Sequence, residues 1–171
     1  DVLFLCYICT IAMPWQSYMI PQFIIMKKLG LVNTHLSLMI LQSFTAFGVF
    51  LVRQFYMEIP NEICEAARID GMSEYGIYAK IMLPLSKPVI ATLTIFSFTT
   101  VWNDFMGPLI YINSENLKTI QLGLRSFITE YSSEYSLIMA GSVVALIPVL
   151  LVFACLQKYF VEGIASTGVK G

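Results

Sequence analysis

The chain has 171 residues, of which 57% are hydrophobic and only 12% are charged, and its formal net charge is −1. Soluble globular domains carry about 25% charged residues, so half that level, with the charges clustered, indicates a membrane protein. A net charge this close to zero gives no indication of a nucleic-acid partner.

Four apolar stretches, each near the roughly 20 residues that a membrane-spanning helix needs, follow one another along the chain. They cover residues 2–26, 36–52, 88–110 and 135–157. Their apolar runs do not alternate with polar residues, so helices are expected rather than barrel strands. The sequence therefore predicts an all-α polytopic membrane protein, a transmembrane helix bundle. Because the chain starts at Asp1 directly in apolar sequence, we expect residues 1–171 to be the C-terminal part of a single transmembrane domain, with N-terminal spans missing.

Cysteine usage does not indicate a redox or metal site. Cys6 and Cys9 have a C-x-x-C spacing, but they lie inside an apolar run without polar flanks. We interpret them as small residues of a membrane helix, and Cys64 and Cys155 do not complete a disulfide framework. No metal or cofactor is expected.

The charged loop between the second and third stretches, residues 53–87, determines the predicted orientation. Together with the C-terminal tail it holds six of the 10 Lys and Arg residues. Lys and Arg in short loops favour the cytoplasmic side of the membrane. We therefore expect this loop and the C-terminus to lie in the cytoplasm.

Within the loop, the sequence predicts a helix, a glycine turn and a second helix. The first helix covers residues 59–70, and Gly71 follows as its C-terminal stop. The second begins at Ser73, a typical N-cap, and is expected to end at Leu83-Pro84. Two interpretations stay open: a folded knob that docks on a partner, or an amphipathic helical pair that lies on the membrane surface.

The spacing of residues in this loop resembles the EAA signature of the membrane subunits of ABC importers. The pattern reads "EAA", three residues, Gly, nine residues, Ile, one residue, "LP". Further segments, such as "WNDFMGPL", "MAGSVVALIPVLLVF" and "QKYFVEGIASTGVKG", extend the similarity over essentially the whole chain. They are similar to the carbohydrate-uptake branch, and most of all to the smaller membrane subunit of maltose-type transporters. Members of this family usually have six spans.

The resemblance implies that the loop is the coupling helix-turn-helix of a type I ABC importer permease, docked on a separate ATP-hydrolysing subunit. The residues to which this role is carried over are Glu65, Ala66, Ala67, Asp70, Gly71, Ile81, Leu83 and Pro84. In this interpretation the small Ala66 and Ala67 side chains let the partner approach closely. Glu65 then pairs with a basic residue of the partner.

The resemblance also implies an assembly around the chain. Its parts are an ABC ATPase subunit in two copies, a second permease subunit, a solute-binding protein outside the cell or in the periplasm, and the lipid bilayer. The chain would cross the cytoplasmic membrane of a prokaryote several times and translocate a sugar, an oligosaccharide or a related polar solute. Segments 27–34 and 113–134 are candidates for contact with the binding protein. The chain itself is not expected to be an enzyme, because it lacks the G-x-x-x-x-G-K-[ST] loop that binds ATP.

Trp102, Asn103 and Asp104 introduce polar groups into the third apolar stretch. An ionisable residue within a membrane normally faces a cavity or a partner. One interpretation is that these three residues line the sugar pathway, with Asn103 and Asp104 bonding hydroxyl groups and Trp102 stacking on a sugar face. The other is that Asp104 caps a helix or pairs structurally. His35, the single histidine, is interpreted as an interfacial capping residue rather than a proton relay.

Two other function classes stay open on the sequence alone. A secondary carrier driven by protons or sodium would need intramembrane carboxylates or broken helices in paired halves, and only Asp104 answers this description. A membrane-bound enzyme or scaffold would leave the charged loop lying on the membrane surface. Dependence of transport on ATP, rather than on a proton gradient, discriminates the importer from the carrier.

Overall fold

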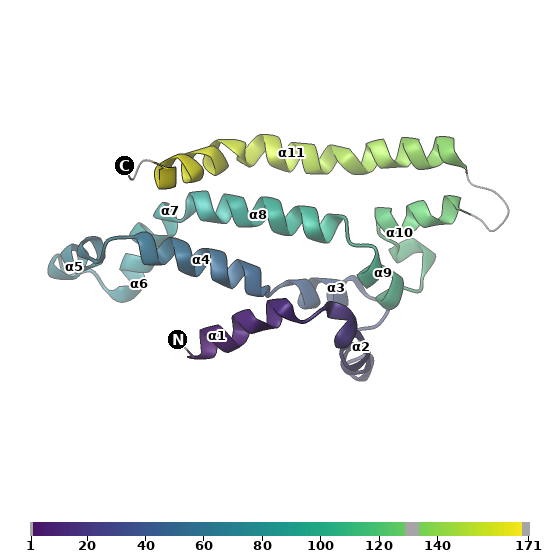
Figure 1. Ribbon diagram of the computed structural model, residues 1–171, viewed down its shortest axis with the longest axis horizontal. Helices are drawn as coiled ribbons and strands as arrows, with labels where there is room; N and C mark the ends of the chain where they lie inside the picture. The colour runs from purple at the N-terminus through teal and green to yellow at the C-terminus, as the bar shows by residue number, and fades with distance from the viewer. Residues whose placement is uncertain (1, 129–133, 169–171) are drawn as a thin grey trace. The chain divides into compact units, whose positions relative to one another are not determined.

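Figure 1 shows the computed structural model of the chain, which describes residues 2–128 and 134–168. Within these ranges the chain forms helices, joined by short 3-10 and π-helical turns, and no extended strand. This confirms the predicted all-α class. The helices group into two compact units, which are described separately. The first comprises residues 1–46 and 98–152, and the second comprises residues 47–97 and 153–171.

In the first unit, the segment 2–26 is divided at Pro14 rather than forming one helix. The elements on either side are α1 (Val2–Cys9) with the turn η1 (Thr10–Ala12), then η2 (Trp15–Ser17) with α2 (Met19–Lys28). Proline has no N–H to donate and its ring clashes with the preceding helical turn, so the chain at Pro14 is extended, with ψ 137°. Pro21 lies in the first turn of α2, where a proline is tolerated.

The rest of the first unit is built around α3 (His35–Gln42) and α9 (Met106–Tyr111), which contact each other. Thr34 caps α3, because its Oγ1 accepts a hydrogen bond from the backbone N of Ser37 (3.4 Å). The elements after α9 are η4 (Glu115–Leu117), α10 (Ile120–Leu124) and η5 (Arg125–Phe127).

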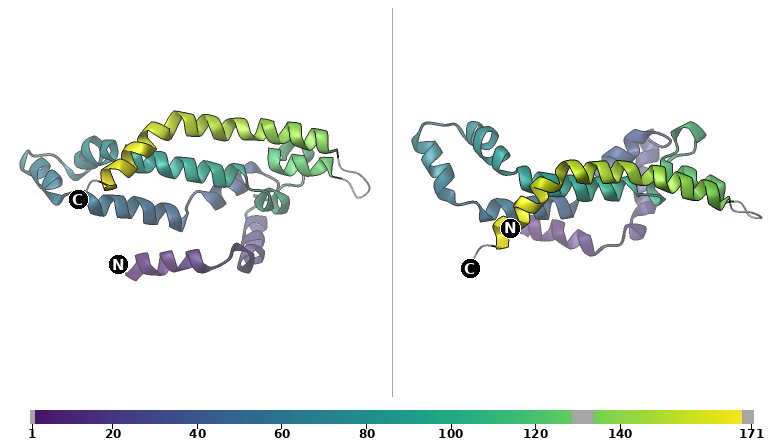
Figure 2. Two further views of the ribbon diagram at one scale, coloured as in Figure 1. Left: turned by 45° about the horizontal axis from the view of Figure 1, so that its top comes forward. Right: turned by 90° about the horizontal axis from the view of Figure 1, so that it is seen from above.

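In the second unit, α4 (Ala46–Glu58) leads into a set of short helical elements. These are α5 (Asn61–Ile69), α6 (Glu74–Ile77), the π-helical turn η3 (Tyr78–Met82) and α7 (Leu83–Leu85). Figures 1 and 2 show α5 and α6 side by side, and the two helices contact each other. We refer to residues 61–85 as the hairpin.

Two longer helices, α8 (Lys87–Trp102) and α11 (Tyr135–Gly168), coincide with parts of the third and fourth predicted spans. The stretch 88–110 is two helices, α8 and α9, with a break around Asp104. The break has a local cause, because Oδ1 of Asp104 accepts a hydrogen bond from the backbone N of Gly107 (3.1 Å) and so starts a new helix. Pro148, by contrast, lies inside α11 without ending it.

One helix in the described ranges, Tyr135–Tyr159, is long and apolar enough to cross a membrane by itself. Up to three spans result if two bent helix pairs each count as one, namely His35–Gln42 with Ala46–Glu58 and Glu74–Leu85 with Lys87–Trp102. The apolar helix Val2–Ala12 is shorter than a span. The four predicted spans, the missing N-terminal spans and the orientation of the chain therefore stay predictions.

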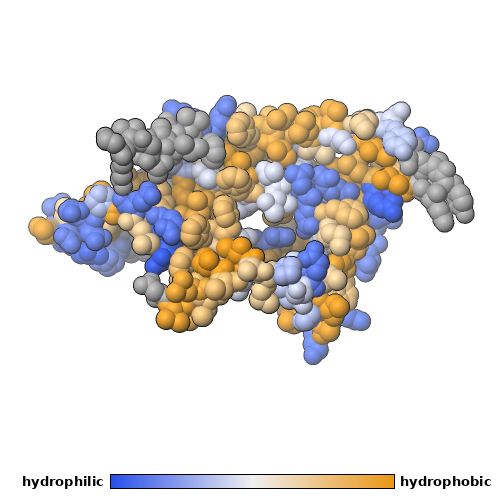
Figure 3. Space-filling view, viewed as in Figure 1, coloured by the Kyte–Doolittle hydropathy of each residue, from blue (hydrophilic) through white to orange (hydrophobic). Residues whose placement is uncertain are grey.

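The surface of the chain separates apolar and polar regions (Figure 3). Orange, apolar atoms follow α11 along the upper edge of the view, where the exposed side chains include Leu137, Met139, Val143, Val144, Leu150 and Leu151. An apolar surface of this kind is stable against lipid tails and unfavourable in water. Blue, hydrophilic atoms gather instead over α5 and α6. The hydrophilic surface of the hairpin is thus suited to water, whereas the apolar surface of α11 is suited to lipid.

Candidate functional site

The turn of the hairpin is fixed by Gly71. Its φ of +80° is a left-handed conformation that residues with a Cβ adopt only with strain. The backbone N of Gly71 donates to the carbonyl of Arg68, and that of Met72 donates to the carbonyl of Ala67, both at 3.0 Å. These two bonds form a Schellman motif, which satisfies the last carbonyl groups of α5. The predicted helix, glycine turn and helix are therefore confirmed.

The second arm of the hairpin begins as predicted and ends later than predicted. Ser73 caps α6, because its Oγ accepts a hydrogen bond from the backbone N of Gly76 (3.2 Å). The arm then continues through Pro84 to Leu85, so the expectation that Leu83-Pro84 ends it is wrong. The π-helical turn before Leu83 explains this, because it shifts the backbone bonding from the i−4 pattern that a proline disrupts.

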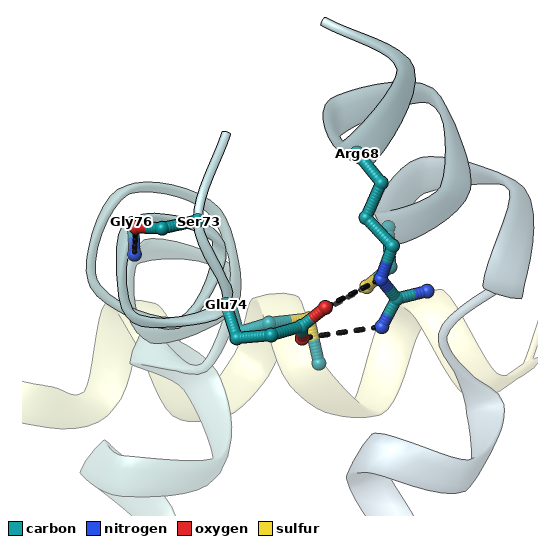
Figure 4. Close-up of polar contacts among 6 residues, drawn as sticks. Arg68, Ser73, Glu74 and Gly76 are labelled. Atoms are coloured by element: carbon teal, nitrogen blue, oxygen red, sulfur yellow. Dashed lines mark hydrogen bonds and ion pairs between the residues drawn. The ribbon is translucent and has the colours of Figure 1, made fainter. Parts of the chain in front are cut away.

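An ion pair joins the two arms across the turn. Figure 4 shows the side chains of Arg68 and Glu74 extending toward each other, with Nε to Oε1 at 2.6 Å and Nη2 to Oε2 at 3.2 Å. The hydrogen bond from Arg68 holds the pKa of Glu74 below its usual value, and the hydrogen bond and charge of Glu74 raise the pKa of Arg68. Both side chains are largely exposed, 52% for Arg68 and 73% for Glu74, so water screens the pair.

The hairpin has its own small core and an apolar outer surface. Ala67 and Ile77 are buried, and the small side chain of Ala67 suits the contact of α5 with α6. Ile69 and Tyr75, which flank the turn, are 86% and 80% exposed. Large apolar side chains held this far into solvent are typical of an interaction surface.

A buried hydroxyl group joins the end of the hairpin to α4. Ser86 is fully buried at the bend between α7 and α8, where the helix axis turns by 66°. Its Oγ donates to the carbonyl of Met82 (2.6 Å) and lies 3.0 Å from the hydroxyl of Tyr56 on α4. Since Ser86 has one hydroxyl proton, Tyr56 is the donor of the second bond. The helix that enters the hairpin is therefore bonded to the bend that leaves it.

The predicted coupling residues divide by burial. Glu65, Ala66, Asp70, Gly71, Leu83 and Pro84 are exposed, and Ile81 is half-buried. Ala67 is buried inside the hairpin, so its side chain is not on the outer surface where the sequence analysis expected a partner to approach. Ile69 and Tyr75 were not among the predicted residues. An apolar residue between Arg68 and Asp70, off the apolar stripe of α5, is the signal that would have indicated Ile69.

The three predicted pathway residues face three different surroundings. The indole Nε1 of Trp102 donates to the carbonyl of Ala145 (2.9 Å), and its ring stacks on Phe98. Asn103 donates to the carbonyl of Thr99 (2.9 Å) and accepts from the amide of Gln121 (3.2 Å). Asp104 bonds the backbone N of Gly107 in the first turn of α9, a structural role such as one of the two interpretations expected, and it also lines a cavity.

That cavity lies entirely within the first unit and has a volume of about 290 Å³. Its lining residues are Trp15, Tyr18, Gln22, Leu38, Leu41, Gln42, Thr100, Asp104, Gly107 and Tyr111. Trp102 and Asn103 are not among them. Trp15, Tyr18 and Gln22 were not predicted as site residues, although the polar and aromatic run "PWQSYMIPQ" within an apolar stretch is a usable signal.

Asn33 joins two segments of the first unit that are far apart in the sequence. Its backbone N donates to the carbonyl of Tyr111 (2.7 Å), and its Oδ1 accepts from the backbone N atoms of Asn113 and Ser114 (3.0 and 2.9 Å). Its Nδ2 donates to Oγ of Ser114 (2.8 Å). We refer to these four residues as the Asn33 clasp.

The Asn33 clasp connects the two segments, 27–34 and 113–134, that were candidates for contact with a binding protein. Residues 129–133 of the second segment lie outside the described ranges. Nearby, Nε2 of His35 donates to the carbonyl of Leu117 (2.8 Å), because a carbonyl oxygen only accepts. His35 therefore bonds a neighbouring turn, and Thr34 rather than His35 caps α3.

Comparison with known proteins identifies relatives along nearly the whole chain. Residues 1–166 match the family described as "Binding-protein-dependent transport system inner membrane component". The chain is 38% identical, over 98% of its length, to an arabinooligosaccharides transport system permease protein of Halalkalibacterium halodurans, of which it covers 60%. It is 36% identical, over 92% of its length, to a lactose transport system permease protein of Rhizobium radiobacter, of which it covers 58%.

A solved structure is similar as well. The fold matches a bacterial ABC transporter involved in the import of the acidic polysaccharide alginate, with a TM-score of 0.80 and 28% identity over 94% of this chain and 61% of that one. These matches confirm the resemblance to permeases of carbohydrate-uptake ABC importers. The chain spans about 60% of the length of the curated relatives. It is a membrane protein, and it belongs to the family of binding-protein-dependent transport system inner membrane components.

Proposed function

We propose that the chain is part of a permease subunit of an ABC importer, which forms half of a translocation pathway in the cytoplasmic membrane of a prokaryote. ATP hydrolysis takes place on a separate subunit, present in two copies. A second permease subunit completes the pathway, and an external solute-binding protein delivers the solute. The observation that carries this proposal is the hairpin, whose bonded turn presents Ile69 and Tyr75 to solvent between two apolar helices.

The hairpin has the features of a docking element. Ile69 and Tyr75 supply exposed apolar area on the two sides of its turn, and Glu65, Ala66 and Asp70, on the same helix as Ile69 or directly after it, are exposed as well. Exposed apolar residues combined with polar ones are the usual composition of a protein interface. Glu65, exposed on α5, is available for a charge-assisted hydrogen bond with a basic residue of the ATPase.

Motion of the ATPase passes to the membrane helices because the hairpin is connected to them by bonds and not only by the chain. The hydrogen bonds of Ser86 with Tyr56 and Met82 link the bend before α8 to α4. A displacement of the hairpin then moves both helices together, as a rigid body. In the proposed cycle, the loaded binding protein and ATP favour an outward-open pathway, and hydrolysis returns it inward.

The proposed substrate class is a sugar or oligosaccharide. Support comes from the relatives, whose names refer to arabinooligosaccharides and lactose. An enzymatic role for the chain is not proposed, because ATP chemistry is assigned to the partner.

The proposal is tested with the full-length protein, its ATPase, its second permease subunit and its binding protein reconstituted in liposomes. Uptake of a labelled neutral trisaccharide should require ATP and persist when a proton ionophore is added. Glu65→Lys should lower uptake about tenfold or more, because it removes a charged interfacial contact and repels the basic partner.

The matched control is Glu58→Lys, the same substitution at an exposed residue of α4 just outside the hairpin. It should leave uptake within about twofold of the unmodified transporter, since a surface substitution away from an interface changes little. Uptake that continues without ATP and collapses with the proton gradient would instead identify a secondary carrier.

A further inference from the structure

The cavity beside Asp104 has the composition of a carbohydrate site. At about 290 Å³ it is near the lower end of the range of roughly 300–1,000 Å³ that is typical of small-molecule pockets. It therefore has room for a small ligand or for one end of a longer one. The side chains that matter for recognition are Trp15, Tyr18, Gln22, Gln42 and Asp104. They combine aromatic rings, against which the apolar face of a sugar packs, with groups that bond hydroxyls.

Gln22 is held in one orientation by two donors. Its Oε1 accepts a hydrogen bond from the indole Nε1 of Trp15 (2.9 Å) and another from the hydroxyl of Tyr111 (3.3 Å). An indole N–H can only donate, so this contact identifies which end of the Gln22 amide is the oxygen. The amide NH₂ is left to donate to another acceptor, such as a sugar hydroxyl.

Tyr111 makes this arrangement rigid. It is fully buried, and its ring centroid lies 5.9 Å from that of Phe23 on α2. The Tyr111 hydroxyl therefore has a fixed position. Its hydrogen bond to Oε1 of Gln22 fixes the orientation of the Gln22 amide as well. Side chains fixed before a ligand arrives bind it more tightly, because less freedom is lost on binding.

Asp104 supplies an acceptor on another side of the cavity. Its Oδ1 is occupied by the backbone N of Gly107, and among the described residues no donor bonds its Oδ2. Gly107 is needed for this arrangement, because a Cβ at that position would collide with Oδ2 of Asp104. The carboxylate is thus fixed by one oxygen and offers the other to a ligand.

Charge indicates which sugars fit. Asp104 is the one charged side chain among the described residues that line the cavity, so a carboxylated sugar would meet an unbalanced negative charge there. In a partly dehydrated site this repulsion is stronger than in water. We propose that this cavity binds the end of a neutral oligosaccharide and that Asp104 disfavours acidic ones. The proposal rests on the proposed function and deepens it by naming the solute class and the residues that select it.

The test measures equilibrium binding to the complete transporter in lipid nanodiscs with the binding protein omitted, so that its own selectivity does not contribute. The probes are a panel of labelled neutral trisaccharides, including arabinotriose, and trigalacturonate as the acidic counterpart. Gln22→Glu keeps the oxygen that Trp15 and Tyr111 bond and removes the NH₂ donors. We expect it to raise the Kd of the neutral sugar about tenfold, the effect of losing one strong hydrogen bond.

Asp104→Asn keeps the Oδ1 acceptor for Gly107 and removes the charge. We expect it to weaken neutral-sugar binding and to reduce the preference over trigalacturonate, again by about tenfold. The matched control is Gln16→Glu, the same substitution at the exposed neighbour of Trp15 outside the cavity, and it should leave both Kd values unchanged.

Unchanged Kd values in Gln22→Glu and Asp104→Asn, or preferential binding of trigalacturonate by the unmodified transporter, would overturn the proposal. Failure of the proposed function has a different signature. In that case the unmodified transporter, supplied with its binding protein, shows no ATP-dependent uptake of any probe. Uptake that is ATP-dependent while the two variants bind like the parent therefore rejects the cavity alone.

Discussion

The hairpin and the Asn33 clasp both fix the path of the chain with hydrogen bonds, the hairpin at one turn and the clasp between two segments. In the hairpin, all the bonds that fix the turn join residues within six positions of each other, from Arg68 to Glu74. In the clasp, Asn33 bonds residues 80 and 81 positions away. The hairpin is therefore a local structure, and the clasp exists only when distant segments have already come together.

This difference determines how each region responds to change. A local turn re-forms quickly and tolerates the loss of one contact, because its ends stay close along the chain. A bond between distant segments offsets the conformational entropy that is lost when a long loop closes. When this bond is removed, the two segments are no longer held together by the chain nearby, and both are released. We therefore expect substitutions in the clasp to affect stability more than those in the hairpin, and substitutions in the hairpin to affect coupling more.

Asn33→Ala should have the largest effect on stability. It removes three side-chain hydrogen bonds and leaves a residue with a Cβ at φ +64°, where asparagine is tolerated better than alanine. The expected loss in the free energy of unfolding is about 3 kcal/mol. Unfolding of the detergent-solubilised protein, followed by circular dichroism with increasing denaturant, measures it.

Two further variants separate the causes. Asn113→Ala is the matched control, because the clasp uses the backbone N of Asn113 and its side chain is exposed. Asn33→Gly restores the backbone conformation without the side-chain bonds, so it should recover about 1 kcal/mol of the loss. If Asn113→Ala destabilised the protein as much as Asn33→Ala, the distinction between clasp and hairpin would fail.

Gly71→Ala should have an intermediate effect. Gly71 and Gly30 both adopt positive φ, at +80° and +69°, and neither has an atom within 4 Å of an added Cβ. Both substitutions should therefore cost about 1 kcal/mol of unfolding free energy through backbone strain alone. The two glycines lie in different parts of the fold, because Gly30 follows the end of α2 and Gly71 forms the turn of the hairpin.

Comparing Gly71→Ala with Gly30→Ala thus separates an effect on stability from an effect on coupling. Gly71→Ala should weaken binding of the ATPase to the reconstituted permease, because the strain acts on the docking surface. Gly30→Ala should leave this binding unchanged, because segment 27–34 is a candidate for contact with the binding protein and not with the ATPase. Equal losses of ATPase binding in both variants would show that destabilisation, and not the hairpin, is responsible.

The same contrast explains what the sequence could predict. The hairpin was predictable because Ser73 and Gly71 act on backbone groups within a few residues. The extension of its second arm past Pro84 was missed, because it depends on a π-helical turn that has no composition signature. The cavity was missed because Gln22 and Tyr111 belong to segments 89 positions apart, and their contact is a product of tertiary packing. Of the three predicted pathway residues, only Asp104 lines it.

The smallest effect should come from the ion pair of the hairpin, and it should depend on pH. Because the pKa of Glu74 lies below its usual 4.5 in the folded chain, the stabilisation from the pair is fully present above that pH. It is lost as the pH falls through the lowered pKa. Arg68, whose pKa is raised, stays charged over this whole range.

Glu74→Gln should therefore lower the melting temperature slightly at pH 7 and by less at pH 3, because the parent loses its charge as the pH falls through the lowered pKa of Glu74. Salt at about 1 M should also remove most of the difference at pH 7, since both side chains are largely exposed. Thermal melts of the parent and the variant at both pH values measure this effect. Subtracting the two melting temperatures at each pH cancels the contribution from the titration of other groups. A difference as large at pH 3 as at pH 7 would assign the effect to side-chain packing instead. The ion pair would then belong with the contacts of the Asn33 clasp, whose strength does not depend on charge.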